Sequence, residues 1–407
     1  MSASPESTIS RSRRLAMLVA LCGGALLSTG TTIGITPFLL DIAHDLGTDL
    51  SAAGNLVALQ SVTWGIASLF AGAASDRLGR RPLLSVGLVL LVISALGVAL
   101  ADSYVWVAAW RLFGGLGGGC FMGTVFATVS DHVPVAQRGR SLGWVVTGQS
   151  LALVLGVPAM TLAGTVGGWR GAIFGQGLVV LACAVAVWFV VPHSTSRGSV
   201  APMPFRSVAR LVGPRVMALL LANSTERVCY AAVAVFLPTF LLTRYALDPP
   251  HLALGLGLVA LGNLLGNVVG AQLSDRLPAP QLVLAVSLIG AGILALPILS
   301  WAPSAPVSIL LGFVYTLVNA GGRPAVLTLL SGVSSEARGA VLGLNITFSS
   351  LGWIGATALG GAVLGFAGFG GLAVLTFVFG LLGGALALAA WLVPSQRARL
   401  VVARGER

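Results

Sequence analysis

The chain has 407 residues, of which 56% are hydrophobic and 9% are charged, and its mean hydropathy is +0.96. No soluble domain of this length requires so much apolar surface, so the composition predicts a protein with many membrane spans in a lipid bilayer. The net charge is +11, and the sequence contains arginine but no lysine. The arginines fall in short segments between apolar runs, which favours membrane topology over nucleic-acid binding.

At roughly 20 residues for each span, about twelve helices fit into the chain. The first half, residues 1–192, is predicted to contain six of them. The third span ends near residue 101 and the fourth begins near residue 105. The other four have the approximate ranges 15–40, 52–73, 142–163 and 171–191.

The second half is predicted to repeat this pattern. A basic segment with no acidic residue, 193–214, reads as a linker, and a basic tail occupies 396–407. Between them lies the C-terminal half, 215–395. Its six predicted spans are 215–242, 252–272, 280–300, 305–330, 340–364 and 370–393.

The arginines also predict the orientation of the chain in the membrane. Of the 23, 18 fall on one side of the predicted spans, and only Arg170 and Arg244 fall on the other. Basic loops stay in the cytoplasm, so we expect both termini to be cytoplasmic. Three further arginines, Arg111, Arg227 and Arg323, lie within spans.

The densest group of charges lies between the second and third spans, in the sequence GAASDRLGRRP at 72–82. Gly79 permits a sharp reversal between two helices, and Pro82 suits the first turn of the second helix. The four-residue sequence Ser75–Leu78 recurs as Ser274–Leu277 at the same place in the second half. Such a repeat indicates two pseudo-symmetric halves.

This loop resembles the signature loop of the major facilitator superfamily, specifically the prokaryotic twelve-helix group of drug or metabolite:proton antiporters. The resemblance implies an all-α membrane fold of two six-helix halves and a cytoplasmic gate, in which charges on the loop contact the other half. Alternatively, these residues only anchor the loop at the membrane surface. The matching residues are Gly72, Asp76, Arg77, Gly79, Arg80 and Arg81.

One acidic residue stands apart from the other eleven, which fall in loops, at span ends or in tails. Glu226 lies about eleven residues into a span, roughly 16 Å deep at the rise of an α-helix. A carboxylate at that depth usually faces a cavity or an ionic partner. Glu226 is therefore predicted to be a proton-coupling or substrate-binding residue, or else half of a structural ion pair.

The three arginines inside spans are the other candidates. Arg227 follows Glu226, but adjacent helical positions point about 100° apart, so the two need not pair. An arginine at the position of Arg111 is linked to proton transfer in the resembled family, although this chain has Gly114 where that pattern has glutamine. Alternatively, Arg111 is satisfied by backbone carbonyl oxygens in a helix kinked at glycine. Arg323 lies near the inner end of its span and is expected to extend to the cytoplasmic surface or, alternatively, to line the transport pathway.

Further candidates are small or polar residues within spans. Gly148, Gly156 and Pro158 resemble the helix motif of antiporters and predict a kinked, closely packed helix between the halves. Polar side chains could line a cavity or join helices by hydrogen bonds. These cavity candidates are Asn55, Gln60, Gln149, Asn263, Asn267, Asn319 and Asn345.

These features predict a secondary transporter of the prokaryotic inner membrane, expected to be a monomer. It would export a small organic compound, a drug or a sugar-like metabolite, by alternating access, coupled to protons. The alternative is an uptake permease for an organic anion, and a membrane receptor is less favoured because the loops are short. No nucleophile–base pair or metal cluster is apparent at membrane depth, so we expect no enzyme, metal or cofactor.

Overall fold

The computed structural model describes residues 10–192, 213–301, 303–331 and 335–392. Almost all of these residues are helical, and the described ranges contain no strand. The predicted linker at 193–214 therefore lies outside the described residues except for its last two positions, and the predicted tail at 396–407 lies outside them completely. Nine helical stretches of the described chain are long and apolar enough to cross a membrane.

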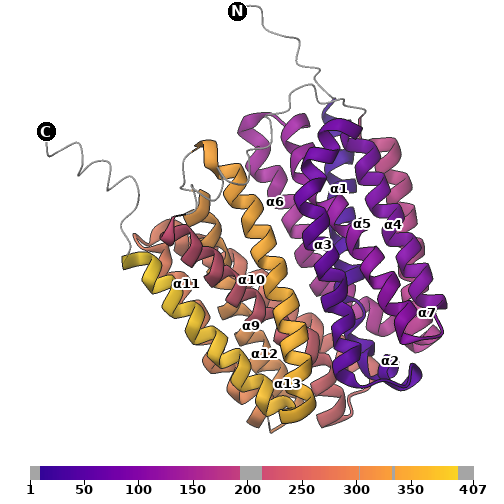
Figure 1. Cartoon of the computed structure of the whole chain (residues 1–407), viewed down its shortest axis with the longest axis vertical. Helices are drawn as coiled ribbons and strands as arrows, with labels where there is room; N and C mark the ends of the chain where they lie inside the picture. The colour runs from indigo at the N-terminus through magenta and orange to yellow at the C-terminus, as the bar shows by residue number, and fades with distance from the viewer. Residues whose placement is uncertain (1–9, 193–212, 302, 332–334, 393–407) are drawn as a thin grey trace, which may run out of the picture.

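The first half contains six spans. Its helices lie together on one side of the bundle (Figure 1). The fifth and sixth are joined without a loop, because α7 bends at Gly167 and Gly168, and Gly168 has a φ of +62° that favours glycine. The helical elements are α1 (Arg11–Ile33), the 3₁₀ turn η1 (Thr36–Phe38), α2 (Leu39–Asp45), α3 (Leu50–Leu78), α4 (Arg80–Leu100), α5 (Tyr104–His132), α6 (Val135–Leu151), the π-helical segment η2 (Ala152–Gly156) and α7 (Val157–Val190).

The second half repeats this arrangement. Its last two spans form the single element α13, which bends at Gly368, where φ is +63°. The elements are α9 (Pro214–Tyr245), α10 (Pro249–Arg276), α11 (Pro280–Leu296), the π-helical segment η3 (Pro297–Trp301), α12 (Ala305–Ser331) and α13 (Ser335–Leu392). Since α7 and α13 each contribute to two spans, the fold has the predicted twelve transmembrane helices.

Local sequence signals explain where several helices start. The Asp49 carboxylate accepts a hydrogen bond of 2.7 Å from the Ala52 amide at the start of α3. Helices α9, α10 and α11 each begin with proline, whose missing N–H is not needed in a first turn. The glycine run in α5 allows close packing, since a Cβ at Gly115 would lie 2.1 Å from the Gln60 carbonyl oxygen of α3.

The helices run between two ends of the bundle. We call the end that holds Gly79 and the start of α9 the signature-loop face, and the end that holds η1 and Gly368 the far face. Helix α1 starts and α13 ends at the signature-loop face (Figure 1). Both copies of the Ser-Asp-Arg-Leu repeat also lie there, at the ends of α3 and α10.

Three apolar cores hold the bundle together, and they differ in which helices they join. One core combines residues of both halves, including Phe38, Leu56 and Phe236, and extends toward the far face. A second core, which includes Met17 and Phe121, contains only residues of the first half. The third is built only from the second half. Among the described residues, the two halves thus share a core on the far side and keep separate cores toward the signature-loop face.

Candidate functional site

Within the described part of the first half, one buried charge lies at membrane depth, Arg111 of α5. Its guanidinium donates hydrogen bonds to three backbone carbonyl oxygens: Thr31 at 2.7 Å, Thr32 at 2.9 Å and Leu56 at 3.1 Å. Thr31 and Thr32 lie in the last turn of α1, where carbonyl oxygens have no partner within their own helix. A cation at a helix C-terminus also interacts favourably with the helix dipole. Arg111 therefore caps α1 from a neighbouring helix.

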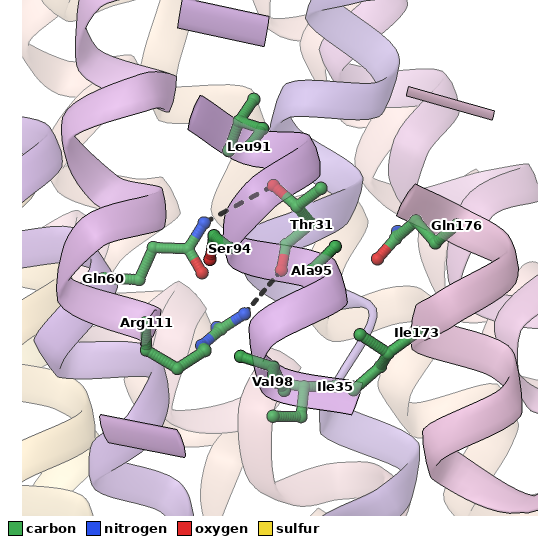
Figure 2. A pocket seen from close by; sticks show the side chains of 10 residues that line it. All are labelled: Thr31, Ile35, Gln60, Leu91, Ser94, Ala95, Val98, Arg111, Ile173 and Gln176. Atoms are coloured by element: carbon green, nitrogen blue, oxygen red, sulfur yellow. Dashed lines mark hydrogen bonds between the residues drawn. The ribbon is translucent and has the colours of Figure 1, made fainter. Parts of the chain in front are cut away.

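A small cavity adjoins Arg111 (Figure 2). Its volume is about 10 Å³, which is room for roughly one water molecule. Gln60 and Gln176 approach it from opposite sides, and the Gln60 amide donates to the Thr31 hydroxyl at 3.4 Å and to the Thr32 hydroxyl at 3.1 Å. This region suits a bound water or a proton relay, but in this conformation it has no space for an organic compound.

The second half holds the predicted acid. Glu226 of α9 is fully buried, and its carboxylate forms a two-point ion pair with the guanidinium of Arg227, which is 4% exposed. The sequence left it open whether these neighbours would pair. The long arginine side chain turns back along its own helix to reach the carboxylate, which overcomes their different directions. Gly352 of α13 lets that helix approach closely here, since a Cβ would lie 2.4 Å from the Ser224 carbonyl oxygen.

Arg323 has more partners than the sequence indicated. It is half-buried and interacts electrostatically with Arg227, Glu226 and Tyr230, so it belongs to the Glu226 cluster and does not simply extend to the membrane surface. The reason is its place on α12, which packs against α9. One glutamate and two arginines thus interact in this half of the protein.

Aromatic and amide side chains surround this cluster. The Arg227 guanidinium lies 5.1 Å from the centroid of the Tyr230 ring, and Tyr230 meets Trp353 edge to face at 5.9 Å. The Asn223 amide donates to the Ser349 hydroxyl at 2.8 Å, which joins α9 to α13. The contacts of Tyr230 and Asn223 join α9 to α13 beside the Glu226 cluster.

The signature loop forms a charge network inside the first half. Arg80 is 6% exposed; it pairs with Asp76 at 2.6 Å and with Asp131 of α5 at 2.8 Å. Arg81 stacks over Trp188 of α7 at 4.4 Å, whereas Arg77 is exposed. Gly79 has a φ of +94°, which fits the predicted sharp reversal. These ionic contacts join α3, α4 and α5, and all lie within one half.

Replacing Arg80 with glutamine is therefore expected to lower the free energy of unfolding by about 2 kcal/mol, because two carboxylates lose a charged partner. Replacing the exposed Arg77 with glutamine should change it by less than about 0.5 kcal/mol. The measurement is the apparent melting temperature of the purified protein in detergent, followed by tryptophan fluorescence. Equal melting temperatures for the two variants would refute a structural role for the network.

The antiporter-like motif lies on the helix that approaches the other half. Gly148 packs against α1, since a Cβ there would lie 2.3 Å from the Cys22 carbonyl oxygen. The segment η2 ends at Gly156, and its π-helical winding interrupts the regular helix. Pro158 touches α10, with its Cγ 3.5 Å from the position of a Cβ at Gly257.

The other polar candidates differ in how their side-chain atoms are paired. Asn263 and Asn267 bond to each other along α10, with the Asn267 amide 3.2 Å from the Asn263 side-chain oxygen, which is a local helix contact. Others carry buried polar atoms with no hydrogen-bond partner among the described residues. These atoms are Oδ1 of Asn55, Oε1 of Gln60, both amide atoms of Asn319 and Oδ1 of Asn345. Gln149 is half-buried.

Sequence reasoning missed two features of this site. It did not connect Arg323 to Glu226, although Tyr315, Asn319 and Arg323 recur at four-residue spacing and so share one face of α12. It also did not identify α1 as the helix that Arg111 caps, although backbone carbonyl oxygens were the alternative partners of this residue. The signal for the first was present in the spacing, whereas the second depends on how helices far apart in the chain pack together.

Known proteins resemble this chain along most of its length. It matches the family profile described as Major Facilitator Superfamily over residues 21–357. It is 28% identical over 319 residues to a chloramphenicol resistance protein of Streptomyces lividans, covering 76% of this chain and 79% of that protein. It is also 24% identical over 350 residues to multidrug resistance protein 2 of Bacillus subtilis, covering 83% of this chain and 85% of that protein.

Solved structures share the twelve-helix fold. A bacterial homologue of the human lysosomal transporter Spinster, inward-facing and unoccupied, aligns with a TM-score of 0.77 and 16% identity over 94% of this chain and 98% of that one. The D-xylose-proton symporter aligns with a TM-score of 0.75 and 19% identity, covering 93% of this chain and 98% of the symporter chain.

Proposed function

Because the chain belongs to the major facilitator superfamily, whose members are transporters and not enzymes, we propose that it exports a small organic compound in exchange for protons. The direction follows the curated relatives named for chloramphenicol and multidrug resistance. The proposal rests on Glu226, a fully buried carboxylate at membrane depth. Protonation of a carboxylate in such a place removes its charge and weakens its interaction with a neighbouring arginine.

The proposed exchange uses the ion pair as the coupling element. When Glu226 is ionised it holds Arg227; when it takes up a proton, the guanidinium is released and can turn toward the space between the halves. Arg323 adds a second positive charge near this pair. A compound that uses the ionised carboxylate would then compete with the proton, as exchange requires.

We place the signature-loop face in the cytoplasm, on the basis of the arginine distribution. The structure would then be an inward-facing state, because the halves share a core only toward the far face. In that state the predicted gate, formed by Asp76, Arg77 and their neighbours, would be open. This agrees with ionic contacts of the loop that remain within the first half.

Uptake of an organic anion is the second candidate. One observation favours it: Arg111, Arg227 and Arg323 outnumber Glu226 inside the spans. Arg111 is a poor receptor for such an anion, because it already donates to three carbonyl oxygens. In this mechanism the anion and the proton would move in the same direction.

The test is proton movement in vesicles that contain the purified protein, with chloramphenicol and D-xylose as the first compounds. Exchange predicts that protons move against the compound and that Glu226→Gln reduces this movement to the level of protein-free vesicles. Asp248→Asn, at an exposed helix start, is the matched control and should behave as wild type. Equal proton movement in wild type and Glu226→Gln would reduce Glu226 to a structural ion pair, and movement in the same direction would favour symport.

A further inference from the structure

One face of α12 lies against the Glu226 cluster. Tyr315, Asn319 and Arg323 are four residues apart and therefore align along the helix. At one end of this stripe the Tyr315 hydroxyl donates to the Cys229 carbonyl oxygen of α9 at 2.6 Å. At the other end Arg323 interacts with Glu226 and Arg227. Asn319 lies between them and so faces the same part of α9.

Asn319 is the unexplained member of the stripe. Its side chain is fully buried, and neither its amide nitrogen nor its amide oxygen has a hydrogen-bond partner among the described residues. Leaving a buried polar group unpaired costs about 1–3 kcal/mol. Such a residue rarely persists for packing alone, since leucine has a similar size and carries no such penalty.

The charge around Asn319 limits which ligand could pair with it. Arg227 and Arg323 outnumber Glu226, so the cluster carries one net positive charge and repels a cation. A carboxylate has only acceptors and could satisfy the Asn319 nitrogen but not its oxygen. An uncharged hydroxyl both donates and accepts, and two neighbouring hydroxyls could satisfy both atoms of the amide.

We propose that Asn319 and Arg323, with the Glu226–Arg227 pair, form a subsite for an uncharged hydroxyl-bearing group of the transported compound, and that this subsite rejects organic cations. A hydroxyl of the compound donates to the Asn319 oxygen or to the ionised Glu226 carboxylate, while the Asn319 nitrogen and Arg323 donate to hydroxyl oxygens. Tyr230 and Trp353 provide aromatic surface beside the subsite. The inference rests on the proposed transport function and names the chemistry of its substrate.

Three compounds with the same carbon skeleton test the subsite: phenylpropanediol, which is neutral, phenyllactate, an anion, and phenylalaninol, a cation at neutral pH. Binding is measured by calorimetry with the full chain in lipid nanodiscs. The diol is expected to bind roughly tenfold or more tightly than the cation. No gradient is required, so a protein that binds the diol but moves no protons would contradict the proposed transport and leave the subsite intact.

Two variants assign the effect to α12. Asn319→Leu should weaken binding of the diol by roughly tenfold while its melting temperature stays equal or rises, because an unpaired polar group is removed. Arg323→Gln should reduce the difference in binding affinity between the diol and the cation. Arg244→Gln, the same change of charge at the exposed end of α9, is the control and should bind as wild type.

The inference is overturned if phenylalaninol binds as tightly as the diol, or if wild type does not bind the diol. It is also overturned if phenyllactate binds most tightly, which would identify an anion site. A loss of binding in Asn319→Leu accompanied by a lower melting temperature would point to misfolding and would equally contradict the proposed role of Asn319.

Discussion

Replacing Arg227 with glutamine is expected to lower the free energy of unfolding by about 3–5 kcal/mol, because the change leaves a fully buried carboxylate without its ionic partner. Glutamine can donate one hydrogen bond but carries no charge. Arg323 cannot fully replace Arg227, since it lies on another helix and is only half-buried. The remaining penalty is that of an isolated charge in a medium of low polarity.

The double variant Glu226→Gln/Arg227→Gln distinguishes the cost of an unpaired buried carboxylate from the contribution of the ion pair itself to the free energy of unfolding. Removing both charges should restore most of the lost stability, because two amides of similar shape can bond to each other. The measurement is chemical unfolding in detergent micelles, followed by tryptophan fluorescence. If Arg227→Gln unfolds at the same denaturant concentration as wild type, then Arg323 has taken over the carboxylate.

A second large effect is expected for Arg111→Met, which should lower the free energy of unfolding by about 3 kcal/mol or more. The methionine keeps much of the side-chain volume but leaves the carbonyl oxygens of Thr31, Thr32 and Leu56 without this donor. The end of α1 would lose its cap and its contact with α5. We expect greater hydrogen exchange at the end of α1, measurable by mass spectrometry.

The control for Arg111→Met is Arg170→Gln at the far face. Arg170 pairs with Asp45, but both side chains are more than a third exposed, so water screens the pair and its loss should change stability by less than about 1 kcal/mol. If the two variants were equally stable, the bonds from Arg111 to α1 would not be structural, and its proposed role would shift toward transport.

The fold was predictable because a membrane span requires a long run of apolar residues, which can be recognised in the sequence. Runs of apolar residues, the arginine-rich loop at 72–82 and its repeat at 274–277 together predicted twelve helices in two halves. The structure differs from the prediction in two connections between spans. The predicted loops before residues 171 and 370 are bends at Gly168 and Gly368 inside continuous helices. A glycine with positive φ can turn a chain without polar residues, and composition does not reveal that.

For the candidate site, the sequence identified individual residues but not the contacts between them. Glu226 stood out because a buried charge is costly in a membrane, and the structure indeed buries it completely. Its partners were harder to find, because the pairing with Arg227 depends on a side-chain conformation and the approach of Arg323 depends on how α12 packs against α9. Sequence spacing defines the face of one helix but not which helix lies opposite.

The three apolar cores imply a preferred resting state. Each half keeps its own core toward the signature-loop face, so the halves can part or meet there as rigid bodies without losing internal packing. Parting them at the far face would bring side chains such as Phe38 and Phe236 into water, at about 1.5–3 kcal/mol for each large apolar side chain. The empty protein should therefore rest with its far face closed, and the free energy to open it must come from binding at the site or from new contacts made as the opposite face closes.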